Sequence, residues 1–486
     1  MRKFVLPLSI VILVLALVMA VRTMRFVPYP DTARGGEPLP VVNDSLLAAH
    51  LAGAVRIPTV SYQDSTPQVA QLRALHGYLE QTFPRTYAAL SHEVVGDASL
   101  LFRWAGSDTT LQPVVMMAHL DVVPVEPGTD SAWTHRPFSG DVAEGFVWGR
   151  GTLDDKVGVL STLEGVEALL ARKYRPRRTV YLAFGDDEEV AGHGAADIVE
   201  LLRARGVRPL VAVDEGSAIV EGIVPGIDRP VGLIGIAEKG HMSVQLTVSA
   251  EGGHSSMPPP QTAVGVLAQA IDRLEKHPLP PRLDGPTAAM FDHLGREMPL
   301  GTRIAMANLW LTRSRVIRSL AASPTTNASI RTTTAPTVIR GSPKANVLPT
   351  HAQAIVNFRI ISGETPATVL SHVRSVVDDP RVSITLSGQP APPSPVSSTT
   401  SAAYRTLERG IRALAPSAII SPSLVVGATD ARVYGGFARD VYRFLPVRVG
   451  PNDLDRFHGT NERIGVRDYG RAVGFMTNLI AALSTQ

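Results

Sequence analysis

Histidine and carboxylate residues follow short apolar segments or turns at five places in the sequence, namely His119, Asp154, Glu189, Glu215 and His458. The intervals between them are 35, 35, 26 and 243 residues, so only folding can bring them together. The chain contains 13 histidines and no cysteine, and any metal ion must therefore be held by imidazoles and carboxylates. Two histidines with several carboxylates suit zinc, cobalt or manganese. A shared carboxylate would allow two such ions to polarise an acyl oxygen and ionise a water molecule.

The triplet His119-Leu120-Asp121 stands at the end of an apolar segment. Residues two apart on a strand point to the same side, so Asp121 can accept a hydrogen bond from one ring nitrogen of His119. A carboxylate that fixes the tautomer of a histidine is the usual partner of a metal-binding imidazole. Taken alone, the triplet is more typical of a histidine that is hydrogen-bonded for structural reasons.

The acidic segments each allow two interpretations. Residues 149–158 place glycines beside adjacent acids at a helix start, but lack the Gly-Lys-Ser/Thr sequence of a phosphate-binding loop. Acidic residues stabilise the N-terminus of a helix in any protein, so the four acids at 186–189 can be a solvated helix start. Alternatively, cations neutralise their mutual repulsion. Considered together with residues 214–216 and 456–460, these segments favour one shared metal site.

The elements that would position these residues follow from the apolar pattern. Residues 114–118, 179–184 and 210–213 are expected to form strands, and residues 157–171 and 195–205 helices. Strands alternating with helices indicate βαβ units. We therefore predict an α/β fold with a mostly parallel sheet flanked by helices. Ligands of such sheets bind beyond the carboxyl ends of the strands, which is where the polar residues fall.

The pattern changes near residue 237, where a smaller α+β unit is expected to be inserted. Residues 242–249, 352–361 and 382–386 read as strands, and residues 262–276 and 366–377 as helices. This unit would serve as a lid or dimerisation domain.

Composition excludes two broad classes of protein. With 47 basic and 44 acidic residues the net charge is only +3, which argues against a nucleic-acid partner bound through charge. Hydrophobic residues make up 44% of the chain, enough for a sizeable core, so global disorder is excluded.

The N-terminus carries 18 uncharged, mostly apolar residues at positions 4–21, flanked by basic residues. This segment predicts either a transmembrane helix that anchors the protein or a cleaved secretory signal. In both cases the rest of the chain is expected outside the cytoplasm, membrane-anchored or secreted.

The motifs as a set resemble the dizinc metallopeptidase family of aminoacylase, carboxypeptidase G and carboxypeptidase S. They are residues 119–121 (HLD), 149–156 (GRGTLDDK), 187–189 (DEE), 214–216 (DEG), 253–256 (GHSS) and 458–463 (HGTNER). The Asp-Glu-Gly motif and the apolar N-terminal segment are most similar to carboxypeptidase S and to the N-fatty-acyl-amino-acid synthase/hydrolase. The resemblance covers roughly residues 45–486.

The resemblance implies a binding site for two divalent metal ions, expected to be zinc. Their ligands would be His119, Asp154, Glu189, Glu215 and His458. Asp154 would bridge the ions, with His119 and Glu215 on one and Glu189 and His458 on the other. Asp214 remains the alternative to Glu215, since both are acids of the same motif.

The resemblance also implies the catalytic residues. Glu188 would be the general base, and Asp121 would orient His119. His254 would come from the smaller domain and stabilise the oxyanion, across the interface of a possible homodimer. The Asp154–Asp155 peptide bond is typically cis in this family.

Three further positions match residues that hold the substrate. Asn346 and Arg359 would bind the substrate carboxylate, a task that suits the two-pronged guanidinium group of arginine. Gly427 would lie in the glycine-rich turn beside the substrate. The family usually has a second glycine where Ala428 stands, which weakens that last match.

These inferences give a metal-dependent hydrolase that cleaves an amide next to a free carboxylate, in short peptides or N-acyl amino acids. The alternative is a non-catalytic ligand-binding protein on the same scaffold. The predicted organisation is an anchor or signal segment (1–25), a linker (26–44), a catalytic domain in two parts (45–236 and 389–486) and an inserted lid or dimerisation domain (237–388).

Overall fold

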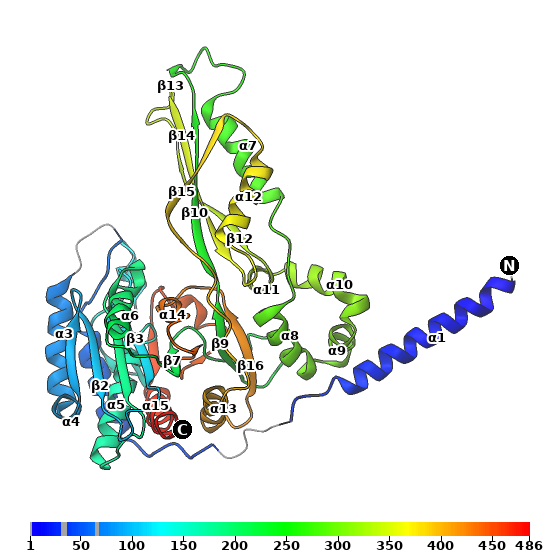
Figure 1. Ribbon diagram of the computed structural model, residues 1–486. Helices are drawn as coiled ribbons and strands as arrows, with labels where there is room; N and C mark the ends of the chain where they lie inside the picture. The colour runs from blue at the N-terminus through cyan, green and yellow to red at the C-terminus, as the bar shows by residue number, and fades with distance from the viewer. Residues whose placement is uncertain (1, 31–35, 64–67) are drawn as a thin grey trace.

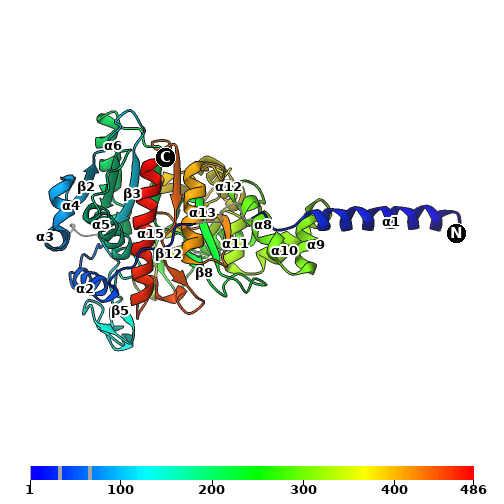
Figure 2. The same cartoon turned by 90° about the horizontal axis from the view of Figure 1, so that it is seen from below.

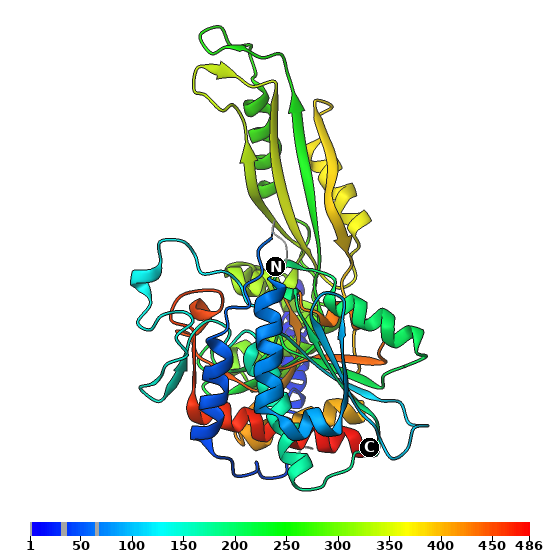
Figure 3. The same cartoon turned by 90° about the vertical axis from the view of Figure 1, so that its left-hand side faces the viewer.

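The computed structural model describes residues 2–30, 36–63 and 68–486, and side chains from residue 9 onward. It has a larger part built on a wide sheet and a slender part that rises from it (Figure 1). A view from the side shows how far the slender part stands out from the larger one (Figure 3).

The sheet of the larger part has ten strands in the order β1-β2-β6-β3-β7-β17-β9-β8-β18, with β16 beside β9. The pairs β6-β3, β3-β7, β7-β17, β9-β16 and β8-β18 are parallel. The pairs β1-β2 and β2-β6 at one edge, and β17-β9 and β8-β9, are antiparallel. The strands are β1 (Ser91–Val95), β2 (Ser99–Trp104), β3 (Val114–His119), β6 (Val180–Gly185), β7 (Val211–Asp214), β8 (Ile219–Val220), β9 (Val231–Glu238), β16 (Ile419–Val425), β17 (Asp440–Arg443) and β18 (Arg448–Val449). The expected α/β fold with mostly parallel strands is confirmed.

Helices cover both faces of this sheet. They are α2 (Asp44–Val55), α3 (Val69–Thr82), α4 (Pro84–Ala89), α5 (Lys156–Ala171), α6 (Gly194–Ala204), α13 (Ala402–Leu414), α14 (Ala431–Tyr434) and α15 (Val466–Thr485). Alternate residues of β3 serve different faces: Met116 joins the core with α5 and α15, whereas Val115 and Met117 pack towards α6. The sheet is therefore buried on both sides, which explains why its central strands read as continuous apolar runs.

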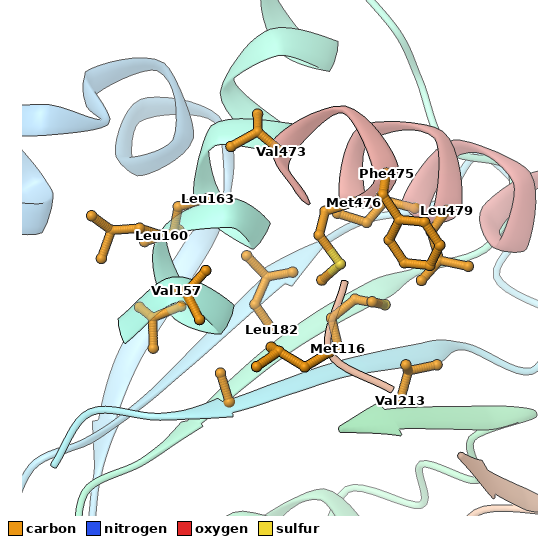
Figure 4. Packing of buried hydrophobic residues seen from close by; sticks show 14 of the residues in the cluster. Met116, Val157, Leu160, Leu163, Leu182, Val213, Val473, Phe475, Met476 and Leu479 are labelled. Carbon is orange, nitrogen blue, oxygen red and sulfur yellow. The ribbon is translucent and has the colours of Figure 1, made fainter. Parts of the chain in front are cut away.

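Helices α5 and α15 lie side by side under the sheet, although their sequences are about 300 residues apart (Figure 2). Val157, Leu160 and Leu163 of α5 meet Met476 and Leu479 of α15 in one apolar cluster (Figure 4). The end of the chain therefore completes the core begun by its first half.

The slender part is a four-stranded antiparallel sheet in the order β12-β14-β10-β15. Its elements are β10 (Gly240–Ser249), α7 (Ala263–Lys276), β12 (Thr333–Arg340), β14 (His351–Ile360), α12 (Pro366–Val377) and β15 (Val382–Ala391), with the short pair β11 (Gly253–His254) and β13 (Val347–Leu348) at its far end. Burial alternates along β10 and β14, and the buried side chains form a separate core with α7 and α12. Every strand and helix expected in this region forms; the domain boundaries remain a prediction.

Four helices between α7 and β12 were not expected from the sequence: α8 (Gly285–Glu297), α9 (Leu300–Ala307), α10 (Leu309–Ala321) and α11 (Pro324–Ile330). Helix α8 packs against β16, so Leu294 shares a core with Ile419 of the larger part. These helices connect the two parts of the chain. Their weak apolar pattern explains why they escaped prediction, since Val316 is the one buried residue of α10.

The prediction of a membrane anchor or transmembrane helix in residues 1–25 is wrong. Helix α1 (Arg2–Arg25) forms and extends away from the body (Figures 1 and 2). However, in the described part of the chain no helix is both long and apolar enough to cross a bilayer.

Candidate metal centre

Asp154 lies between two histidines from opposite ends of the sequence. Its Oδ1 is 2.9 Å from Nε2 of His119, and its Oδ2 is 3.0 Å from Nε2 of His458. Glu189 Oε2 lies 3.3 Å from the same nitrogen of His458. One donor atom each from His119, Asp154 and Glu189 falls within 4.8 Å of the other two, close enough to share a metal ion. The structure therefore brings together four of the five predicted ligands.

Charge dominates the chemistry of this cluster. Burial alone would lower the pKa of His119, but hydrogen bonds to Asp121 and Asp154 raise it well above its ordinary value. Hydrogen bonds to Asp154 and Glu189 raise the pKa of His458 to about 10. Burial and the nearby acids raise the pKa of Glu189. Buried carboxylates this close to one another need compensating positive charge.

Asp121, two residues after the end of β3, contacts His119 and the acidic turn on the side away from Asp154. Its Oδ1 is 3.3 Å from Nδ1 of His119, the ring nitrogen that faces away from Asp154. Its two carboxylate oxygens also accept hydrogen bonds from the backbone N–H groups of Glu188 (3.1 Å) and Glu189 (3.2 Å). Asp121 thus fixes both the imidazole and the acidic turn (Glu188–Val190), which is more than the sequence predicted for it.

Glu188 precedes Glu189 on this turn and lies among the same charges. Burial raises its pKa well above the ordinary value; His119 opposes this effect, while Asp430, Glu189 and Asp154 add to it. A carboxyl group in this position is suited to exchange protons with a reacting water.

Asp214 and Glu215 behave differently although they are neighbours at the end of β7. Asp214 Oδ2 accepts a 2.7 Å hydrogen bond from the backbone N–H of Ala431, so its carboxylate is engaged with the loop before α14. Burial raises the pKa of both residues, to about 6 for Asp214 and well above the ordinary value for Glu215. Because the Asp214 carboxylate is engaged with the loop, Glu215 is the better candidate for the fifth ligand.

A buried ion pair connects the loop of Asp154 to the loop of His458. Nη1 of Arg150 donates a 2.6 Å hydrogen bond to Glu462 Oε2. Glu462 Oε1 accepts from the backbone N–H groups of Gly151 (2.9 Å) and Leu153 (2.8 Å). The Asp154–Asp155 peptide bond that follows is cis, as the resemblance implied.

Arg150 and Glu462 were given no role from the sequence, although both stand inside the motifs. The available signal was an arginine in one motif and a glutamate in the other, two opposite charges that the ligand and base assignments left unused. Lys156 was missed in the same way: it is buried and donates to the carbonyl oxygens of Ala54 (2.9 Å) and Ile57 (2.6 Å), fixing the start of α5.

His254 and Asn346 are not brought to the cluster within one chain. His254 is exposed on β11, which pairs with β13 at the far tip of the slender part (Figure 1). The carbonyl oxygen of Asn346 accepts a hydrogen bond from the N–H of Ser255 in the same place. His254 and Asn346 are thus close to each other and far from Asp154.

Arg359 and Gly427 lie nearer to the larger part. Arg359 pairs with His241, next to the end of the β10–β14 register where Gly240 pairs with Ile360. Gly427 is exposed in the loop after β16 and has open space around its Cα. The same loop continues to Thr429, whose hydroxyl donates a 2.9 Å hydrogen bond to Glu238.

Comparison with known proteins agrees with this geometry. The model of peptidase family M20/M25/M40 matches residues 115–482, which include all five predicted metal ligands. The chain belongs to this family. It is therefore a metallopeptidase-type hydrolase that acts on amide bonds, which confirms the predicted enzyme class and disfavours a non-catalytic binding protein.

Proteins of this family with substantial sequence identity include two named types. The N-fatty-acyl-amino acid synthase/hydrolase PM20D1 of Xenopus tropicalis is 41% identical over 440 residues, covering 89% of this chain and 85% of the relative. The probable carboxypeptidase S-like 2 of Dictyostelium discoideum is 38% identical over 445 residues, covering 90% and 85%.

Solved structures share the fold at low identity. The M20 family metallo-carboxypeptidase Sso-CP2 from Sulfolobus solfataricus matches with a TM-score of 0.64 and 16% identity, covering 90% of this chain and 99% of the other. Human carnosine dipeptidase 1 matches with a TM-score of 0.62 and 17% identity, covering 92% and 100%.

The residues present fit a metal centre. Imidazole nitrogens and carboxylate oxygens are the donors that divalent transition metals take from proteins. Oε1 of Glu189 is buried and has no hydrogen-bond partner among the described residues, so this oxygen is free to bind a cation.

Proposed function

We propose that this protein uses two divalent metal ions, expected to be zinc, to hydrolyse the amide bond of an N-acyl amino acid or short peptide with a free carboxylate. His119 and Glu215 would hold one ion and Glu189 and His458 the other, with Asp154 between them. The observation that carries the proposal is the contact of both carboxylate oxygens of Asp154 with two different histidines. Ions held there would polarise the acyl carbonyl and make water more acidic.

The chain's own residues would move the proton. Glu188 would take a proton from the attacking water and return it to the nitrogen of the leaving amine. General base catalysis of this kind contributes about 10²–10⁴-fold to the rate. Asp121 would keep Glu188 in place through the hydrogen bond to its backbone N–H.

Both parts of the chain would supply substrate contacts. Arg359 would bind the substrate carboxylate, and Gly427 would line the site with its backbone. His254 and Asn346 lie at the far tip of their own chain, so we propose that they act in the site of a second copy within a homodimer. There His254 would stabilise the oxyanion.

Two related proteins suggest different acyl groups, since one is named for N-fatty-acyl amino acids and the other for carboxypeptidase activity. We propose that both substrate types be compared by varying the acyl group, from an amino acid to a fatty chain, over one leaving amino acid. We also propose that this protein works outside the cytoplasm, because the composition of residues 4–21 resembles that of a secretory signal.

Replacing Glu188 by Gln tests the proposed chemistry. The variant should keep its metal content, because Glu188 is not a proposed ligand, while kcat falls about 10²–10⁴-fold. Metal content is measured by elemental analysis and kcat by release of the amino acid. Undiminished kcat with full metal content would contradict the base assignment.

A further inference from the structure

Lys239 is a buried cation at the junction between the two parts of the chain. It follows β9 and precedes β10, and its residue is only 2% exposed. Its backbone N–H donates a 3.0 Å hydrogen bond to the carbonyl oxygen of Val425. Its Nζ atom is buried and has no hydrogen-bond partner among the described residues.

Other buried cations in the larger part are neutralised or hydrogen-bonded. Lys156 donates to two backbone carbonyl oxygens. Arg150 pairs with Glu462, and Arg443 with Glu238, at 2.6 and 3.1 Å. A buried ammonium group without a partner costs free energy unless a counter-ion reaches it. Lys239 therefore stands out as a cation that lacks its anion.

A second cation lies next to Lys239. Arg359 pairs with His241 in the β10–β14 ladder, and His241 is two residues after Lys239 in the sequence. In addition to burial, which is the larger effect, the charge of Arg359 lowers the pKa of Lys239 to about 7. No carboxylate of the described residues pairs with Arg359 within 4 Å, and nearby Glu364 is already bonded to the hydroxyl of Thr332.

Two segments of the chain pass between the larger and the slender part, residues 238–240 and residues 391–394, and they contact each other. The N–H of Ser394 donates to the carbonyl oxygen of Glu238, and Gly240 packs so tightly on Pro392 and Ala391 that a Cβ there would overlap them. The peptide carrying Lys239 is therefore held in place. Its four-carbon side chain is flexible, however, and can turn its ammonium group towards a ligand without backbone movement.

We infer that Lys239 is a substrate-binding residue that, with Arg359, binds the carboxylate of the substrate and makes the enzyme selective for a free carboxylate. The inference rests on the proposed function, because it concerns the same substrate group. The ligand's carboxylate supplies the anion that Lys239 and Arg359 lack, so a substrate with an uncharged end leaves two cations unpaired and is rejected.

The test compares binding of an N-acyl amino acid with binding of its carboxamide, which lacks the negative charge. Calorimetry with the metal-loaded Glu188→Gln protein measures affinity without turnover. Adding Lys239→Met, a neutral residue of similar length, should weaken binding of the acid at least tenfold and leave carboxamide binding within twofold. Lys239→Arg, which keeps the charge, should recover most of the loss.

The control is Lys276→Met, which removes an exposed lysine of α7 paired only with Asp272 on the surface. This variant should bind both compounds as the parent does. Equal acid affinity with Lys or Met at position 239 would overturn the inference. A parent that binds the acid selectively while the Glu188-containing enzyme hydrolyses neither compound would instead refute the proposed function and leave the role of Lys239 supported.

Melting temperatures show whether Lys239→Met remains folded. Removing an unpaired buried charge should leave the melting temperature unchanged or raise it. A large decrease, together with equal weakening of acid and carboxamide binding, would mean that Lys239 has a structural role only, and would also overturn the inference.

Discussion

Replacing Glu462 by Ala should damage both the stability of the larger domain and the metal centre. The side chains of Arg150 and Glu462 are 2% and 0% exposed, so the substitution leaves a buried guanidinium without its counter-ion. The backbone N–H groups of Gly151 and Leu153 lose their acceptor as well. Breaking a buried ion pair costs about 3–5 kcal/mol, and we expect a loss of unfolding free energy in this range.

The exposed pair formed by Arg205 and Glu93 provides a matched control. It has the same two residue types, one of its contacts is 2.8 Å long, and its side chains are 45% and 41% exposed. Replacing Glu93 by Ala should cost less than about 1 kcal/mol, because solvent screens a surface pair.

Urea unfolding followed by tryptophan fluorescence measures both variants, and elemental analysis measures their metal content. Glu462→Ala should also lower the metal content, because the pair connects the loop of Asp154 to that of His458. If Glu462→Ala cost no more than Glu93→Ala and kept its metal, the proposed role of the ion pair would be wrong.

Three further outcomes are expected. Asp121→Asn should weaken zinc binding about 10–100-fold in a competition assay. The reason is that the side-chain amide cannot accept hydrogen bonds from both the Glu188 and the Glu189 N–H groups. Unchanged zinc affinity would contradict the positioning role of Asp121. Chelation should lower the melting temperature in calorimetry, since the clustered acids lose their compensating charge, and an unaffected transition would argue against a structural contribution of the ions. Deleting residues 1–21 should leave the melting temperature unchanged, whereas deleting residues 1–30 should lower it. The longer deletion removes Tyr29, whose ring centre lies 4.2 Å from the guanidinium carbon of Arg296. Equal melting temperatures of the two truncated proteins would show that this contact does not stabilise the fold.

The sequence predicted the central strands, and it predicted that His119, Asp154 and Glu189 lie together, because apolar runs and the polar residues that follow them leave local signals. β3 was expected over residues 114–118 and ends one residue later, since an apolar run buried on both faces stops where polar residues begin. The proximity of His119, Glu189 and Glu215 followed from strand ends that share one edge of the sheet, whereas Asp154 and His458 lie in loops that only the fold brings there.

Other features depend on tertiary contacts and could not be predicted in this way. The position of His254 depends on how far the antiparallel sheet carries β11 from the larger part, which no local pattern records. Lys239 directly follows the apolar strand β9 and Glu238, but lysine is ordinarily exposed, so the sequence gives no reason to expect it to be buried. Helices α10 and α11 bury one residue each, Val316 and Ile330, so they lack the apolar stripe by which a helix is recognised.

Helix α15 is translated long after β3, β6 and α5, and this delay affects the order of folding during synthesis. The slender part is continuous from β10 to β15, so its core can close while the ribosome is still translating. The larger core must wait for α15, and until then the apolar faces of β3, β6 and α5 stay uncovered. Newly made chains are therefore at greatest risk of aggregation through their first half, where chaperone binding should concentrate.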